Sequence, residues 1–363
     1  MTEFSPQACV PLADMTTIGV GGAAEWWVSV ANVEGAQEAG AWAAQRAVPV
    51  TVIGGGSNLV VSDRGVPGLV VQMAIGGTRC DWAGDALHVL AGAGVGWDAL
   101  VAEVVALGAW GMECLSGIPG SVGATPLQNV GAYGQTISQT LVSVDAVDVS
   151  SGERKVFTAR ECDLGYRTSR FRERDRDRYM IVSARYVLGR VAASEHYPDV
   201  QRGLAALGVD EPGPADIRAI VLAIRRSKGM VVDQLDPDSR SVGSFFVNPV
   251  LDRRTAEQLG RIAGGADPVM FPSGSGMLKV PAAWLIERTG ACKGLIAGRV
   301  GLSSKHTLAI VNRGGATADD VVALAVQIKQ RVLDQFGIAL RPEPRFLGFD
   351  EDERMKFLLG EAS

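Results

Sequence analysis

The chain has 363 residues, of which 47% are hydrophobic and 21% charged, as in a globular protein of two or three domains. Its 40 Asp and Glu residues outnumber 35 Lys and Arg residues, and this formal charge of −5 argues against a protein that binds nucleic-acid backbones. The five cysteines form no C-x-x-C pair, so no disulfide framework or structural zinc site is indicated. With no signal-like start and no long apolar span, we expect a cytoplasmic protein without a membrane partner.

The first predicted elements form a β-α-β unit. Strands are expected at 25–30 and 48–53, with a helix at 34–47 between them. The second strand runs into three glycines and then into further strands at 59–61 and 69–73. A Rossmann fold needs the opposite, a glycine turn that opens a helix, so we predict an α+β fold instead.

The elements expected after these are a strand at 88–95, a helix at 97–108, strands at 141–149 and 180–188, and helices at 216–228, 254–263 and 317–336. The last helix is the clearest, because Thr317 and Asp320 have the spacing of a capping box and Gly337 follows the final apolar position. The tail beyond it should be extended, since Pro342 and Pro344 exclude a helix interior.

Two glycine-rich runs are candidate cofactor loops. The run GGGSN at 54–58 follows a strand and offers unobstructed backbone N–H groups, the geometry of an anion nest, although a flexible hinge turn explains it equally well. The run at 117–126 has the same character, and two such loops suggest a dinucleotide. A third run, at 92–96, imitates G-x-G-x-x-G, but its third glycine comes one position early, which disfavours Rossmann-type binding there.

The segment 166–179 holds six arginines, most of which alternate with acidic residues, and this pattern is typical of a solvated, self-neutralised turn. Arg167 precedes the alternation, so it can place a fixed positive charge near developing negative charge. Lys228, at the end of a predicted helix, suits a phosphate or a carboxylate, and Arg225 one turn earlier is a weaker candidate for the same role.

Two further residues could take part in proton transfer. Ser244 follows Gly243 and precedes two phenylalanines, a position that by default is an ordinary turn. The sequence has neither a G-x-S-x-G elbow nor a recognisable histidine triad, so nucleophilic hydrolysis has little support. Glu343 lies between two prolines and by default is a surface carboxylate, but held rigidly near a serine and an arginine it could organise proton transfer.

Five motifs, taken together, carry a resemblance to a known family. In chain order they are GGGSNL at 54–59, GIPGSVGATPLQNVGAYG at 117–134, YRTSRF at 166–171, VGSFFVNP at 242–249 and RPEPRF at 341–346. They resemble the UDP-N-acetylenolpyruvoylglucosamine reductases, the flavoenzyme family called MurB, over nearly the whole chain. The tyrosine of HYPDV makes the chain similar to the longer of the two family types.

The resemblance implies an α+β fold with an FAD-binding unit of the vanillyl-alcohol-oxidase type in two subdomains, 1–73 with 337–363 and 74–229, and a C-terminal α+β substrate-binding domain at 230–336. It implies that NADPH is the co-substrate and that FAD is the cofactor. The substrate would be the enolpyruvyl ether of UDP-N-acetylglucosamine, reduced to UDP-N-acetylmuramate for peptidoglycan synthesis. We expect non-covalent FAD, because no histidine or cysteine stands at a position that justifies a flavin linkage.

The resemblance also assigns residues. The catalytic residues that it implies are Arg167, Ser244 and Glu343. The predicted FAD contacts are Gly54, Gly55, Gly56, Ser57, Asn58, Gly120, Ser121, Gly123, Ala124 and Gly131. The predicted sugar-nucleotide contacts are Tyr197, Lys228 and Asn248, with Arg225 added from its place in the helix. The chain departs from the family at Val247, where a basic residue is expected, and at Arg288, where an uncharged amide is expected.

Two other functions stay open. An oxidase or dehydrogenase of small alcohols could use the same FAD unit, but it has no need of Ser244, Lys228 or Glu343. A flavin- or nucleotide-binding sensor module could use the glycine loops without turnover. We expect no metal and no nucleic-acid partner, and a monomer.

Overall fold

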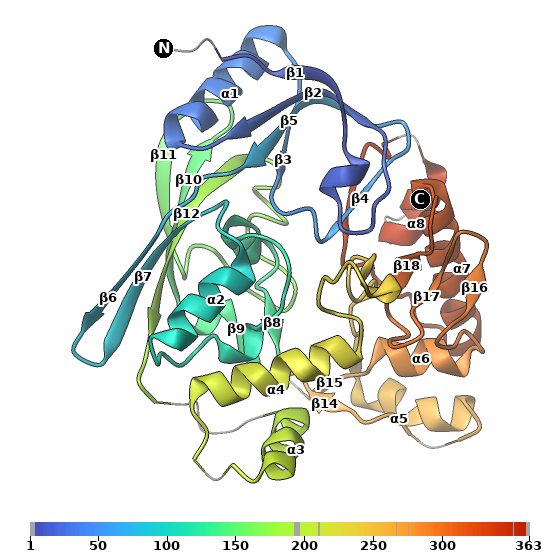
Figure 1. Cartoon of the computed structure of the whole chain (residues 1–363). Coiled ribbons are helices and arrows are strands. Elements are labelled where there is room, and N and C mark those ends of the chain that lie inside the picture. Colours follow the sequence, from blue (N-terminus) through green and yellow to red (C-terminus); the bar gives the residue numbers. More distant parts are fainter. Residues whose placement is uncertain are drawn as a thin grey trace. The chain divides into compact units, whose positions relative to one another are not determined.

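The computed structural model describes residues 4–191, 197–209, 211–265, 267–274, 276–350 and 352–360 (Figure 1). The chain divides into two compact units. The first comprises Met1–Val10, Ala24–Gly56 and Val66–Val231, and the second comprises Pro11–Ala23, Ser57–Gly65 and Val232–Ser363. Both units are therefore assembled from segments that are distant in the sequence.

The first unit contains a four-stranded sheet in the order β1 (Gln7–Pro11), β2 (Ala23–Val30), β5 (Val66–Met73) and β3 (Val50–Ile53). Strands β2 and β3 both run parallel to β5. Helix α1 (Val33–Arg46) connects β2 with β3, so the predicted β-α-β unit is confirmed, with β5 paired between its strands. The helix begins at Asn32, whose side chain accepts a hydrogen bond from the Gly35 backbone.

Helix α1 buries a face of small residues, Ala36, Ala39, Gly40 and Ala43. A Cβ on Gly40 would lie 2.6 Å from the carbonyl oxygen of Val149, the residue after β10 (Leu141–Asp148). The small residues let this helix approach both β5 and β10 closely.

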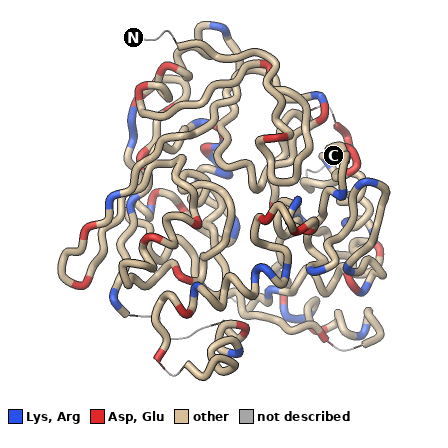
Figure 2. The backbone as a smooth tube through the Cα atoms, viewed as in Figure 1, with Lys and Arg blue, Asp and Glu red and all other residues tan. Residues whose placement is uncertain are grey.

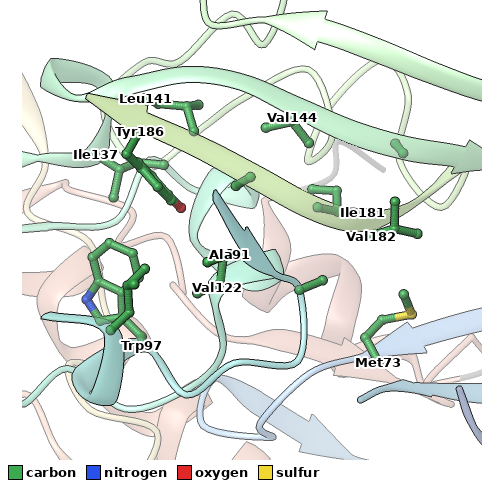
Figure 3. Packing of buried hydrophobic residues seen from close by; sticks show 14 of the residues in the cluster. Met73, Ala91, Trp97, Val122, Ile137, Leu141, Val144, Ile181, Val182 and Tyr186 are labelled. Atoms are coloured by element: carbon green, nitrogen blue, oxygen red, sulfur yellow. The ribbon is translucent and has the colours of Figure 1, made fainter. Parts of the chain in front are cut away.

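The second sheet of this unit is antiparallel, with the order β11 (Arg154–Thr158), β10, β12 (Tyr179–Leu188), β7 (Ala86–Gly92) and β6 (Thr78–Ala83). Helix α2 (Trp97–Ala106) begins at a fully buried tryptophan, whose ring lies 6.0 Å from that of Tyr186, edge to face. The two rings belong to one apolar core with Leu141 and Val122 (Figure 3). The Tyr186 hydroxyl is 3.1 Å from that of Thr125, so its polar end is satisfied.

The rest of this unit consists of short elements and two helices. They are 3-10 turns at Glu113–Leu115, Val122–Leu127 and Ile137–Gln139, the hairpin β8 (Gly131–Ala132) and β9 (Gln135–Thr136), and helices α3 (Pro198–Leu207) and α4 (Pro214–Ser227). Ile217, Ile220 and Val221 of α4 pack in a small apolar cluster with Val200 of α3. This packing explains why the apolar positions of α4 have helical spacing.

The second unit contains two three-stranded sheets and one parallel pair of strands. The sheets are β13 (Val250–Asp252), β15 (Met277–Lys279) and β14 (Phe271–Pro272), and β16 (Ile296–Ala297), β17 (Val300–Leu302) and β18 (Ile310–Asn312); the pair is β4 (Leu59–Val61) and β19 (Arg345–Leu347). A 3-10 turn covers Ala13–Met15 and another covers Pro237–Ser239. The β4–β19 pair joins the C-terminal segment to residues 59–61.

Four helices complete the second unit, α5 (Arg253–Ile262), α6 (Ala282–Arg288), α7 (Ala318–Phe336) and α8 (Glu353–Leu359). Helix α7 has the predicted capping box, because Asp320 N donates to the Thr317 hydroxyl and Thr317 N donates to the Asp320 carboxylate. Gly337 ends the helix with φ +67°. The predicted boundaries of this helix are therefore confirmed.

Acidic and basic residues are interspersed along the backbone (Figure 2). Within the described ranges, no helix combines the length and the apolar composition needed to cross a membrane. The predicted division into two FAD subdomains and a substrate domain remains a prediction, although the two sheets of the first unit fall on either side of residue 73.

Candidate cofactor and catalytic site

The two predicted glycine loops lie against each other within the first unit. A Cβ on Gly54 would overlap the Ser121 hydroxyl, and one on Gly55 would lie 3.0 Å from the Gly120 Cα. The Cβ of Ala124 would be 3.7 Å from the Gly54 Cβ. The chain therefore needs glycine at 54 and 55 for the loops to approach, which a simple hinge does not require.

The third glycine run, 92–96, is hydrogen-bonded to the second glycine loop through the backbone. Trp97 N donates to Gly120 O at 3.0 Å, and Gly123 N donates to Ala93 O at 2.9 Å. A Cβ on Gly123 would lie 2.6 Å from the Ala93 Cβ. The backbone of 92–96 is therefore used to hold the second loop, and the G-x-G-x-x-G likeness has a structural explanation.

Ser121 supplies a test of whether a cofactor fits these loops. Its hydroxyl is buried and has no hydrogen-bond partner among the described residues. A buried polar group without a partner is costly, and a polar ligand atom would satisfy it. The hydroxyl and the bare glycine backbone of 54–56 together fit the diphosphate of a dinucleotide such as FAD.

Arg167 lies in a tight turn with left-handed backbone, φ +56°. Gly165 N donates to Thr168 O at 3.0 Å across this turn, and Asn129 Nδ2 donates to Gly165 O at 3.1 Å. The Arg167 guanidinium donates through Nη2 to Gly131 O at 3.1 Å, so it lies beside the β8–β9 hairpin. A non-glycine residue with this φ is strained by about 1–2 kcal/mol, and such strain is often kept at functional positions.

The predicted ligand residues at the end of α4 form one cluster. The rings of Tyr133 and Tyr197 are 5.8 Å apart in a T-shaped arrangement, and Lys228 Nζ lies 5.7 Å from the Tyr133 ring centre. Lys228 also pairs with Asp199 at 3.2 Å. Burial lowers the pKa of the Arg225 guanidinium, and burial raises the pKa of the neighbouring Tyr133 phenol.

Tyr133 is a member of this cluster that the predicted site residues did not include. It lies in the hairpin turn between β8 and β9, with φ +48°. The left-handed backbone of this non-glycine residue singles out Tyr133 in the structure. The sequence shows only an aromatic residue in a glycine-rich run, so it gave no such signal. His196, beside Tyr197, lies outside the described residues.

In the second unit, backbone pairing joins the segment after Ser244 to the segment that carries Glu343. Glu343 N donates to Phe245 O at 2.8 Å, and Val247 N donates to Arg341 O at 2.9 Å. The proline-bounded tail therefore runs antiparallel to the segment after Ser244. Both the serine and the glutamate are half-buried.

Asn58 and Asn248 have structural contacts in the same unit. Asn58 Nδ2 lies 3.4 Å from Glu343 O, and Asn58 O accepts from Arg345 N at 3.0 Å. Asn248 Oδ1 accepts from Ala282 N at 2.9 Å, at the start of α6. Ligand contact by Asn248 would therefore fall to its amide nitrogen.

The structure also shows the contacts of Val247 and Arg288, the two residues that depart from the family pattern. Val247 pairs through its backbone with Arg341. Arg288 ends α6 with its guanidinium 5.3 Å from the ring centre of Trp284 in the same helix. Of the catalytic candidates, Arg167 belongs to the first unit, and Ser244 and Glu343 belong to the second.

Two family models match the chain. The FAD binding domain model matches residues 24–158, and the model of the UDP-N-acetylenolpyruvoylglucosamine reductase C-terminal domain matches residues 236–347. The expected fold class, an α+β chain with an FAD-binding unit and a C-terminal domain, is confirmed.

Relatives and a solved structure extend this match to almost the whole chain. A UDP-N-acetylenolpyruvoylglucosamine reductase of Thermobifida fusca is 45% identical over 350 residues, covering 93% of this chain and 97% of the relative. One of Saccharopolyspora erythraea is 43% identical over 354 residues, covering 94% and 95%. The crystal structure of MurB from Thermus caldophilus has a TM-score of 0.64 and 26% identity, covering 94% and 99%. The chain therefore belongs to the UDP-N-acetylenolpyruvoylglucosamine reductase family and is an FAD-dependent oxidoreductase.

Proposed function

We propose that the protein uses NADPH and non-covalently bound FAD to reduce the enolpyruvyl ether of UDP-N-acetylglucosamine to UDP-N-acetylmuramate, a step of peptidoglycan precursor synthesis. The observation that supports the proposal is the backbone hydrogen bond from Glu343 N to Phe245 O, which joins the segment that follows Ser244 to the segment that carries Glu343 in a member of this family. An oxidase of small alcohols has no use for Ser244 and Glu343. The five free cysteines agree with a reducing cytoplasm.

The residues that would hold the flavin diphosphate are Gly54, Gly55, Gly120 and the unpartnered Ser121. When bound, FAD supplies the hydride carrier between NADPH and the double bond of the substrate. The contribution of this chain is to bind that carrier and to provide groups for charge and proton transfer.

Arg167 would stabilise negative charge on the substrate. Reduction of the enolpyruvyl double bond leaves charge on the carbon beside the carboxylate, and this charge is shared with the carboxylate oxygens. A guanidinium held by the Gly131 carbonyl and the Asn129-braced turn offers fixed donors to those oxygens. A preorganised cation of this kind needs little rearrangement during the reaction.

Ser244 would supply the proton that completes the product. A hydroxyl is a weak acid at neutral pH, so it can donate only to a strongly basic carbon. Glu343, whose backbone pairs with Phe245, the residue after Ser244, would orient the hydroxyl and help to restore its proton.

Tyr197, Lys228, Arg225 and Asn248 would bind the sugar nucleotide, and Lys228 and Arg225 would also bind NADPH when it occupies the same place. Lys228 is paired with Asp199 at 3.2 Å, so a ligand phosphate would compete with that carboxylate for the ammonium. Lys228 Nζ also lies 5.7 Å from the centre of the Tyr133 ring, which packs edge to face against the Tyr197 ring.

The test is NADPH oxidation in the presence and absence of the enolpyruvyl sugar nucleotide, with the visible spectrum recorded to detect bound flavin. Turnover that requires the sugar nucleotide supports the proposal. Alcohol-dependent reduction of oxygen would favour an oxidase, and a flavin spectrum without turnover would favour a sensor.

A further inference from the structure

Asp98 connects the second glycine loop to helix α4. Its Oδ1 accepts hydrogen bonds from Gly117 N at 2.6 Å and from Arg218 Nη1 at 2.6 Å, and its Oδ2 accepts from Arg218 Nη2 at 3.0 Å. Burial raises the pKa of Asp98, but the bonds from Arg218 and Gly117 more than offset this, so the pKa lies below its usual value. One ionised carboxylate therefore binds a cofactor loop and a helix at the same time.

The 117–123 loop also packs closely against Leu222 and Arg225 of α4. Gly117 has φ +70°, and a Cβ there would be 2.8 Å from Leu222 Cδ2 and 3.4 Å from Arg225 Nε. The Arg225 Nε is buried and has no hydrogen-bond partner among the described residues, while Nη2 donates to Met230 O at 2.7 Å. Because Arg218, Leu222 and Arg225 recur at helical spacing, all three lie on the face of α4 that meets the loop.

We propose that Asp98 is a positioning residue that couples the 117–123 loop to the ligand-binding end of α4. Through Gly117 it fixes the loop, and through Arg218 it fixes the helix that carries Arg225 and Lys228. The identity of the ligands at the two ends rests on the proposed function, but the connection itself rests on the three hydrogen bonds.

The two contacts of Asp98 can be broken separately. Arg218→Ala releases α4 and leaves the Asp98 bond to Gly117, so KM for NADPH and for the sugar nucleotide should rise about tenfold while kcat stays within about threefold. FAD retention in that variant should be unchanged. Asp98→Ala releases the loop as well, so FAD release, measured by flavin fluorescence after dilution, should also increase about tenfold.

A matched control is Asp145→Ala. Asp145 is a buried carboxylate of the same unit that accepts from Arg185 Nη1 at 3.0 Å on the β10–β12 sheet, without contact to either glycine loop in the described hydrogen bonds. It should lower thermal stability without changing KM or FAD release. If Arg218→Ala does not fold, Arg218→Lys keeps the charge, loses the two-point contact and should still raise KM.

Unchanged KM values in both Arg218 variants would overturn the proposal, as would equal effects of Asp145→Ala and Asp98→Ala. Calorimetry of UDP binding to the FAD-loaded protein needs no turnover, so it tests this proposal separately from the proposed function. If the wild type does not reduce the enolpyruvyl substrate, the function fails. The UDP affinity of the Arg218 variants and the FAD release of Asp98→Ala still decide the role of Asp98.

Discussion

Gly54 and Ser121 face each other so closely that a single methyl group on the glycine would overlap the serine hydroxyl. The two residues lie on separate loops and have ordinary backbone conformations, since neither has a positive φ. The space between the loops is therefore set by the absence of a side chain at 54 and not by backbone strain.

Gly54→Ala should weaken FAD binding by at least about tenfold, because an added methyl in a packed contact typically costs 1–3 kcal/mol and would displace Ser121. Flavin content after purification and fluorescence titration measure this. Gly76→Ala is the control, because a Cβ at Gly76 meets nothing within 4 Å and φ there is not positive. Equal flavin loss in both variants would contradict the proposed role of Gly54.

Ser244→Ala should separate the two half-reactions. Reduction of FAD by NADPH needs no proton from Ser244, so its rate should stay near that of the wild type. Reoxidation by the enolpyruvyl substrate should slow by about 10²–10⁴-fold, the usual effect of losing a positioned general acid. Stopped-flow absorbance of the flavin measures both steps, and equal slowing of both would make Ser244 a packing residue.

Lys228→Ala should raise KM for NADPH and for the sugar nucleotide more than it lowers kcat, because the ammonium beside Tyr133 is placed to meet a phosphate. Loss of favourable charge at the C-terminus of α4 is the alternative explanation, and it predicts only a small loss of stability. Arg226→Ala removes an exposed charge from the same last turn and is the matched control. Unchanged affinity in Lys228→Ala would favour the dipole explanation.

Acid precipitation should release the yellow colour into the supernatant, because we expect FAD to be bound without a covalent bond. Burial raises the pKa of the Cys114 thiol to about 12, so the thiolate needed for a flavin linkage is disfavoured. His88 lies on the exposed face of β7. Colour that stays with the denatured pellet would show a covalent flavin.

The sequence predicted the long elements well, because their signals are local. Helix α7 carries its capping box and its C-terminal glycine within its own residues. The strands β13 to β18 have only two or three residues each, too few to show a period, and they were not predicted. The helices α6 and α8 have seven residues each, about two turns, and they were missed for a similar reason. Helix α3, with ten residues, was also not predicted.

The candidate site could be named from motifs, but its contacts could not. The pairing of Phe245 with Glu343 joins distant segments, and no local pattern encodes it. Asp98 resembled an ordinary acidic residue in the first turn of a helix, where it would compensate the helix dipole. Its contacts with Gly117 and Arg218 appear only when three separate elements are folded together.

The left-handed backbone at Arg167 has a consequence for how this chain can change. Glycine or asparagine would suit that turn better, so selection for stability alone would remove the arginine. A search for stabilising substitutions in this protein should therefore return position 167 among its first candidates. Because we propose that Arg167 stabilises negative charge on the substrate, we expect a variant stabilised at this position to be folded and inactive, so stability engineering of this enzyme should leave position 167 unchanged.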